Sequence, residues 1–285
     1  MQSNSLLIAF LHGFSQIMLQ ENVFTGIFFI IGIGIHSPIM LFGAAIAAVS
    51  SLLLAKYLKY DSEEINKGLY GYNAALVGCA ILYFMKPSLL SFTLIILGAF
   101  VSALIMNFML KKVRRVLAFT TPFIITTWLI FILLKLADIQ ISAMLVEDTL
   151  NHFANVTLRG VSQVMFQNHW LSGLIFIIGL MFSSFRVTAW VVAASALAVM
   201  CARFLDFSED LIVLGVYSFN ACLVIIALNV LYSRRFWPIL LAIVITVLLT
   251  KFFITLNIPV LTAPFVLTSW LVIALVRPSN LVIKH

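Results

Sequence analysis

The chain has 285 residues, of which 63% are hydrophobic and 9% are charged, and its mean hydropathy is +1.16. A soluble globular domain has roughly 25% charged residues, so this composition excludes that class and indicates an integral membrane protein. The net charge of +7 comes from basic residues beside apolar segments, which is typical of topology determinants and argues against nucleic-acid binding.

Six apolar stretches follow one another in the first half of the chain. They lack the strict alternation of a transmembrane barrel, so we expect helices. A bilayer core needs about 20 apolar helical residues, and the first two stretches are shorter. One of them is therefore predicted to be a re-entrant half-span. The stretches are Leu6 to Leu19, Val23 to Ile35, Ile39 to Leu58, Gly68 to Met85, Leu89 to Leu110 and Val116 to Leu136.

The second half of the chain repeats the first. The stretch Gly68 to Leu76, Gly-Leu-Tyr-Gly-Tyr-Asn-Ala-Ala-Leu, recurs at Gly215 to Leu223 as Gly-Val-Tyr-Ser-Phe-Asn-Ala-Cys-Leu, with an offset of 215 − 68 = 147. Gly13-Phe-Ser-Gln and Gly160-Val-Ser-Gln have the same offset, 160 − 13 = 147. Internal repeats of half-chain size are typical of membrane transport proteins, whereas solenoid repeats are shorter.

A third repeated pair shows that the second copy is shorter. Thr120 to Trp128 matches Thr262 to Trp270 with an offset of 262 − 120 = 142, so the second copy lacks 147 − 142 = 5 residues. We expect the loss to fall in the loop around Lys86 to Phe92.

Basic residues predict the orientation of the stretches. The cluster Lys111 to Arg115 places the loop between the fifth and sixth stretches in the cytoplasm. If the first stretch of each half is re-entrant and the other five cross, most other basic residues also face the cytoplasm. The acidic loops at residues 138–148 and 206–210 then lie outside. Five crossings per half make the halves inverted and put both termini in the cytoplasm.

The sequence therefore predicts an all-α polytopic membrane protein of two inverted repeats, residues 1–137 and 138–285. Each repeat has five transmembrane helices and one re-entrant half-helix, and a pore lies at the repeat interface. The segments at the bilayer centre lack Asp and Glu, which disfavours an ion-coupled carrier. Lys135, Arg159 and Lys251 lie near segment ends and are expected to snorkel to the membrane surface.

No enzyme constellation is visible, and neither a cofactor nor a metal is expected. The five histidines do not pair with cysteines or carboxylates at the spacing of metal ligands, and no Gly-rich phosphate loop or nucleophilic serine elbow occurs. The three cysteines, Cys79, Cys201 and Cys222, are unclustered residues of apolar stretches, which argues against disulfides.

Neutral polar residues recur in both halves near the bilayer centre. In inverted repeats, matching residues meet around an axis, and a substrate path runs there. The alternative is that these side chains only join helices through hydrogen bonds. The polar pairs are Gln16 with Gln163, Gln20 with Gln167, Asn73 with Asn220, and Thr126 and Thr127 with Thr268 and Ser269. Bulky apolar pairs accompany them: Leu19 with Phe166, Tyr72 with Phe219, and Leu76 with Leu223. Amides and hydroxyls beside aromatic faces suit a flat, neutral, polar solute.

Three motifs carry a resemblance to a known family. They are Gly-x-Ser-Gln-x-x-Phe-Gln-Asn at Gly160, Tyr-x-x-Asn-Ala-x-Leu at Tyr70 and Tyr217, and Thr-x-Pro-Phe at Thr120 and Thr262. Over essentially its whole length the chain resembles the urea transporter family, and specifically a compact bacterial member. The resemblance implies a homotrimer in the bacterial inner membrane, with a pore in each protomer that conducts urea passively and without a coupled ion.

The resemblance also implies which residues line the pore. One mouth would be lined by Gln163, Phe166, Phe219 and Leu223, and the other by Gln16, Leu19, Tyr72 and Leu76, with Thr127 and Ser269 at the constriction near the pseudo-two-fold axis. Leu19 and Tyr72 replace the phenylalanines of the second half, so we expect one mouth to be wider or more polar.

Other functions remain as alternatives. The first is a channel for another small neutral solute, such as a short amide, ammonia, water or glycerol. The second is a secondary carrier coupled to H⁺ or Na⁺. The third is a membrane protein with a scaffolding or sensory role, for which the duplicated polar residues would have no task. No Asn-Pro-Ala motif is present, which argues against an aquaporin.

Overall fold

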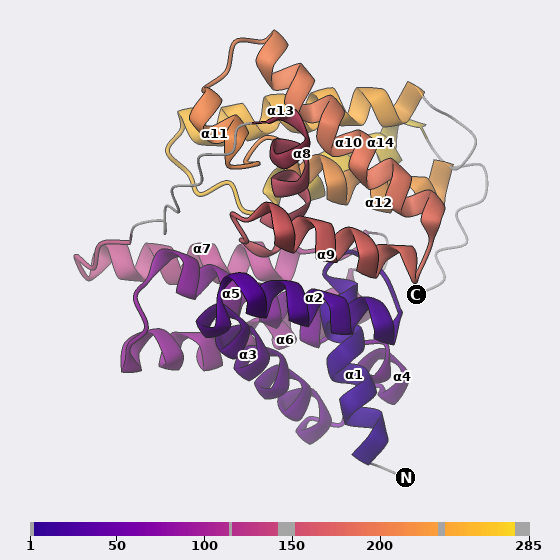
Figure 1. Ribbon diagram of the computed structural model, residues 1–285. Helices are drawn as coiled ribbons and strands as arrows, with labels where there is room; N and C mark the ends of the chain where they lie inside the picture. The colour runs from indigo at the N-terminus through magenta and orange to yellow at the C-terminus, as the bar shows by residue number, and fades with distance from the viewer. Residues whose placement is uncertain (1–2, 114–115, 142–151, 233–236, 277–285) are drawn as a thin grey trace.

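The computed structural model describes residues 3–113, 116–141, 152–232 and 237–276, and every regular element within these ranges is helical (Figure 1). The elements are α1 (Ser3–Gln16), α2 (Val23–His36), α3 (Pro38–Tyr57), α4 (Ser62–Asn66), α5 (Gly71–Phe84), α6 (Leu89–Lys112), α7 (Thr121–Leu136), α8 (Phe153–Ser162), the 3-10 helix η1 (Gln163–Met165), α9 (Trp170–Met181), α10 (Phe185–Phe204), α11 (Glu209–Val213), α12 (Phe219–Tyr232), α13 (Trp237–Thr255) and α14 (Ala263–Val276).

The helices of the two halves correspond one to one. Helix α10 begins 185 − 38 = 147 residues after α3, and α11 begins 209 − 62 = 147 residues after α4. Helix α14 begins 263 − 121 = 142 residues after α7. The duplication in the sequence is therefore also a duplication of the helix order.

The described part of α13 is shorter than its counterpart α6. Helix α6 has 24 residues and α13 has 19. Residues 233–236, which precede α13 and correspond to the loop before α6, lie outside the described residues. The expected loss of five residues in the loop around Lys86 to Phe92 therefore stays a prediction.

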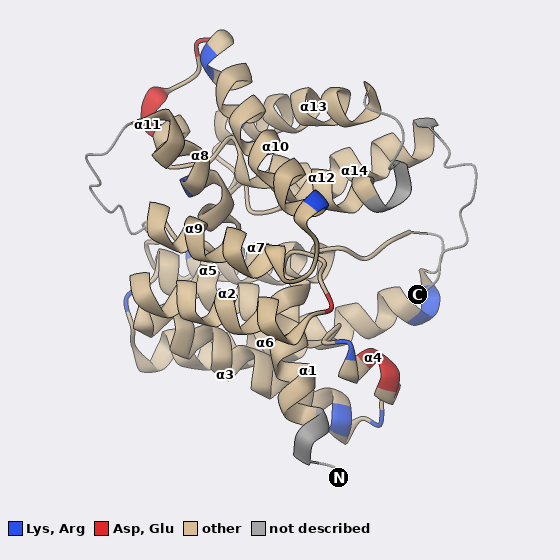
Figure 2. Ribbon diagram, turned by 45° about the vertical axis from the view of Figure 1, so that its right-hand side comes forward, with Lys and Arg blue, Asp and Glu red and all other residues tan. Residues whose placement is uncertain are grey.

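Four of the described helices, α3, α6, α10 and α13, are long and apolar enough to cross a membrane by length and composition. Residues 153–165 and 170–181, which are α8 with η1 and α9, are bent by 75° and together have the length of a fifth span. Large apolar side chains such as Leu89 and Phe204 are exposed on the outer helix faces, as expected for contact with lipid. Charged residues lie mainly at helix ends and on α4 and α11, at opposite ends of the molecule (Figure 2).

The two halves lie against each other, with α2 and α9 side by side at the boundary (Figure 1). Thr25 Oγ1 in α2 donates to the carbonyl oxygen of Gly179 at 2.8 Å, and Ser172 Oγ in α9 donates to that of Gly32 at 2.7 Å. These two bonds are copies of each other, since 172 − 25 = 147 and 179 − 32 = 147. Each half therefore contacts the other through the same groups.

A second reciprocal pair joins α7 and α14. Trp128 Nε1 donates to Pro259 O and Trp270 Nε1 donates to Leu117 O, both at 2.9 Å. Donors and acceptors again share one offset, 270 − 128 = 142 and 259 − 117 = 142. Residues that lie between these bonds meet their own copies, as the hydroxyls of Thr120 and Thr262 do at 2.6 Å. Reciprocal contacts of this kind are made by units related by a two-fold rotation.

We expect Gly78→Ala to destabilise the protein markedly. A Cβ on Gly78 in α5 would lie 2.4 Å from Gly43 O and 2.8 Å from Ala44 Cα, both backbone atoms of α3. Overpacking of this type costs about 1–3 kcal/mol. Gly34→Ala is the matched control, because its Cβ would meet only Leu41 Cδ2, at 3.0 Å. Thermal unfolding of both variants in detergent checks this, and equal midpoints would contradict it.

Candidate substrate passage

Three of the predicted pore residues lie together around a cavity at the end of α1. Gln16, the last residue of this helix, lines a cavity of about 720 Å³ with Leu19 and Tyr72. Leu19 lies in the turn after the helix and has a left-handed backbone, with φ of 54°. We call this cavity the first mouth.

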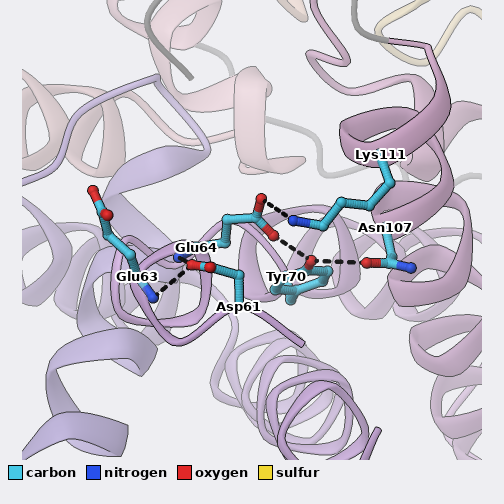
Figure 3. Close-up of polar contacts among 6 residues, drawn as sticks. All are labelled: Asp61, Glu63, Glu64, Tyr70, Asn107 and Lys111. Carbon is cyan, nitrogen blue, oxygen red and sulfur yellow. Dashed lines mark hydrogen bonds and ion pairs between the residues drawn. The ribbon is translucent and has the colours of Figure 1, made fainter. Parts of the chain in front are cut away.

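Glu64, which lines the first mouth, belongs to a polar network (Figure 3). Glu64 Oε1 accepts from Lys111 Nζ at 2.8 Å, and Glu64 Oε2 accepts from Tyr70 OH at 2.7 Å. The Tyr70 hydroxyl also lies 3.3 Å from Asn107 Oδ1, but its single proton favours the nearer carboxylate. The network joins α4 and the start of α5 to the end of α6.

Asp61 caps α4 at the rim of the first mouth. Its Oδ1 accepts from the backbone N–H groups of Glu63 at 2.9 Å and Glu64 at 3.1 Å. These bonds, the one from Glu64 first, hold the pKa of the Asp61 carboxyl below its ordinary value. A lowered pKa means that the cap stabilises the folded state at neutral pH and that this contribution is lost as the pH falls through the folded pKa.

We therefore expect α4 to fray in acid. After correction for intrinsic rates, the amides of Glu63 and Glu64 should exchange hydrogen faster at pH 3 than at pH 7, because the stabilisation by the cap begins to decrease once the pH is below the ordinary Asp pKa of about 3.9. Asp61→Asn keeps a capping oxygen without the charge, so it should remove most of the pH dependence. Hydrogen exchange followed by mass spectrometry checks this, and a wild type with equal protection at both pH values would contradict the cap.

The corresponding residues of the second half are buried, and we call them the second mouth. Gln163, Phe166 and Phe219 are 6%, 7% and 7% exposed. Phe166 again has a left-handed backbone, with φ of 60°. Its ring lies 5.3 Å from that of Tyr83 and 6.1 Å from that of Phe123, measured between centroids. Within the described residues, the buried Gln163 Oε1 has no hydrogen-bond partner.

The remaining predicted residues are buried in the helices that follow. Leu76 in α5 and Leu223 in α12 are fully buried, as are Thr127 in α7 and Ser269 in α14. The Thr127 and Ser269 hydroxyls have no hydrogen-bond partner among the residues that the structure describes. A buried hydroxyl without a partner costs about 1–3 kcal/mol, and a hydrogen bond to a bound polar solute would remove that cost.

Two of the duplicated polar residues, Asn73 and Asn220, form hydrogen bonds to backbone groups of other helices. Asn73 Oδ1 accepts from Phe123 N at 3.1 Å, near the start of α7. Asn220 Oδ1 accepts from Phe265 N at 3.3 Å, and its Nδ2 donates to Leu261 O at 3.1 Å, near the start of α14. The first N–H groups of a helix have no partner within it, so these asparagines act as caps supplied by another helix.

Arg159 does not snorkel, contrary to the expectation from its place near a segment end. It is 1% exposed, and its Nη1 donates to Val213 O at 3.3 Å. Helix α8 ends inside the protein, so its last turn is covered by α11 rather than by the membrane surface. The copy of Arg159 in the first half is His12, whose Nδ1 lies 2.8 Å from Asn66 O, and 159 − 12 = 213 − 66 = 147.

A cavity larger than the first mouth lies elsewhere. A groove of about 1230 Å³ runs between α7 and α14, is lined mainly by apolar residues including Trp128 and Trp270, and contains none of the ten predicted pore residues. The acidic side chains of the first mouth, Glu21, Asp61, Glu63 and Glu64, were missed by the sequence prediction. Each lies in a polar segment between two predicted apolar stretches, where the sequence does not show which charged residues border a cavity.

These features define a multi-pass helical membrane protein with paired polar turns inside it. The model of the urea transporter family matches residues 7–152 and 154–285, so the chain belongs to the urea transporter family, as its motifs predicted. Urea transporter 1 of Ovis aries and that of Capra hircus are each 37% identical to it over 68 residues, which are 24% of this chain and 18% of theirs. Urea transporter 1 of Mus musculus is 35% identical over 74 residues, 26% of this chain and 19% of its own. The matched segment spans about a fifth of these curated relatives.

Proposed function

We propose that this chain is a passive channel for urea in the bacterial inner membrane. The observation that carries the proposal is that three of the ten proposed pore residues have an uncharged, buried polar atom without a partner in the described residues: Gln163 Oε1, Thr127 Oγ1 and Ser269 Oγ. Matching positions in the other half supply Gln16 at the open first mouth. Family membership supports urea as the solute.

Urea offers N–H donors on both sides of a flat molecule and one carbonyl oxygen. In the proposed mechanism the Gln16 and Gln163 oxygens accept these N–H groups as urea loses water at each mouth. The Thr127 and Ser269 hydroxyls take over at the constriction. The apolar side chains of Leu76 and Leu223 offer the solute no further hydrogen bond. These few neutral dipoles could not replace the hydration shell of an ion. The free-energy cost of burying a charge would therefore exclude ions from the passage.

We further propose that residues 1–137 and 138–285 are inverted repeats, each with five crossings and one half-span, and that the passage lies between them. The reciprocal hydrogen bonds and the one-to-one helix order support a two-fold relation. The 75° bend between α8 and α9 supports a re-entrant segment. Both termini would then lie in the cytoplasm.

Cysteine accessibility tests this topology. In a background without Cys79, Cys201 and Cys222, cysteines at positions 59 and 112 should react with an impermeant thiol reagent only from the cytoplasmic face. A cysteine at position 206 should react only from outside. Labelling of 112 and 206 from the same face would refute the inverted arrangement.

The family resemblance also motivates a homotrimer in which each protomer has its own passage. Cross-linking of the purified protein in lipid nanodiscs should yield a species of three chains. If the purified protein is a monomer and conducts urea, the proposed channel function stands and the proposed trimer is wrong.

Transport assays separate the channel from the alternatives. We expect urea flux into proteoliposomes to be unchanged by an uncoupler and by removal of Na⁺, because none of the ten proposed pore residues is an Asp, Glu, His, Lys or Arg. Stopped-flow measurements of urea, ammonia and water in the same vesicles establish the solute. Urea flux that collapses with the proton gradient would identify a carrier instead.

A further inference from the structure

The turn that carries Leu19 is braced by the side chain of the next residue. Ser15 Oγ donates to Gln20 O at 2.7 Å, and Gln20 Nε2 donates to Met18 O at 2.9 Å. The turn thus closes on itself around Leu19. A left-handed backbone at a residue other than glycine is strained and persists only where its surroundings enforce it.

The same brace surrounds Phe166 in the second half. Ser162 Oγ donates to Gln167 O, and Gln167 Nε2 donates to Met165 O at 2.6 Å. Gln167 is fully buried. The same side-chain hydrogen bonds therefore stabilise the corresponding turn in both halves.

In both turns the glutamine oxygen is held by the opposite half. Ser183 Oγ, which follows α9, donates to Gln20 Oε1 at 2.6 Å. His36 Nδ1, at the end of α2, lies 2.9 Å from Gln167 Oε1. An amide oxygen only accepts, so the imidazole donates from Nδ1. The offsets agree, since 183 − 36 = 147 and 167 − 20 = 147.

The two duplicated pairs of glutamines thus have different tasks. Gln163 Oε1 has no partner within the described residues, whereas the oxygen and the nitrogen of the Gln167 amide are both bonded. An amide whose groups are occupied in this way has little left to offer a solute.

We propose that Gln20 and Gln167 are positioning residues: each fixes, through a bond from the opposite half, the direction in which Leu19 or Phe166 meets the passage. They thereby set the size selectivity of the mouths. The inference rests on the proposed urea conduction. It adds a cross-half brace that couples the shape of each mouth to the packing of the other repeat.

Size selectivity is the readout that a merely structural role would not move. The permeabilities of urea and N-methylurea are measured in proteoliposomes for the wild type, Gln167→Met and His36→Ala. We expect the ratio of urea to N-methylurea permeability to fall at least threefold in both variants, because a released Phe166 admits the larger solute. Gln140→Met, the same chemical change at an exposed residue, should leave the ratio unchanged.

The double variant tests the connection between the halves. If Gln167 acts through His36, the combined effect on the ratio is smaller than the product of the single effects. Ser183→Ala, at an exposed residue, is the corresponding test at the first mouth, and it remains informative if Gln167→Met fails to fold.

Each outcome decides the inference. Permeabilities that fall in equal proportion, with an unchanged ratio, overturn it and leave the glutamines a structural role only. Independent effects of Gln167→Met and His36→Ala overturn the cross-half connection. A wild type that conducts no urea contradicts the proposed function instead, so the two failures are distinguishable.

Discussion

Replacing Gln163 with leucine should lower urea permeability about tenfold without harming the folded protein. A net hydrogen bond in a protein is worth roughly 0.5–1.5 kcal/mol, and about 1.4 kcal/mol corresponds to a factor of ten. The Gln163 oxygen is buried and has no partner among the described residues. Replacing an unpaired polar group by an apolar one of similar size is neutral or stabilising, so lost flux could not be attributed to unfolding.

The comparison with the first mouth sharpens this test. Gln16→Leu removes the same amide at a position that borders an open cavity, where water can still solvate the entering solute. We expect a smaller loss there than at Gln163. Stopped-flow urea flux, normalised to the protein reconstituted and accompanied by thermal unfolding, measures both. Wild-type flux in Gln163→Leu would remove this residue from the passage.

Asn220→Leu should be the most destabilising of the substitutions at duplicated polar residues. It leaves Phe265 N–H and Leu261 O buried without a partner, at about 1–3 kcal/mol each. For a chain of this size the unfolding midpoint would fall by roughly 5–15 °C. Asn220→Leu should also lower urea permeability, because Asn220 fixes the start of α14, the helix that carries Ser269.

Two controls bear on Asn220. Asn229→Leu makes the same change in the same helix, but Asn229 Nδ2 is buried without a partner among the described residues, so we expect no loss of stability. Asn73→Leu should cost less than Asn220→Leu, since the Phe119 carbonyl would still accept from the Tyr72 hydroxyl. Thermal unfolding in one detergent compares all three. Equal losses at Asn220 and Asn229 would rule out the capping role.

The asymmetry of the two mouths follows from a few substitutions on a common frame. Both turns have the same hydrogen bonds and the same left-handed residue, yet Gln16 and Leu19 border a cavity while Gln163 and Phe166 are buried. Phe166 packs among aromatic rings that include Tyr83 and Phe123. We infer that the second mouth is the narrower one, and the selectivity measurements at Gln167 address it directly.

The amino-acid sequence alone determined the helical membrane class, the doubled organisation and the family. These are properties of composition and of residues repeated at a constant offset, which need no contact to be recognised. The same patterns did not fix where the five residues are missing from the second half, because the loss can be assigned to any segment between the repeats with offset 147 and the repeat with offset 142. The sequence patterns also predicted that Arg159 reaches the membrane surface. This was wrong because Arg159 is buried beneath α11, and that burial depends on where α8 ends in the folded protein.

Only the tertiary structure showed what Gln20 and Gln167 do. The sequence placed them, with Gln16 and Gln163, among the duplicated polar residues near the bilayer centre, and the resemblance implied a pore role for Gln16 and Gln163 alone. Each helix ends before the second glutamine, and the left-handed residues Leu19 and Phe166 reverse the chain between the two amides. One amide therefore stays at the mouth, and the other turns to a bond from the opposite half.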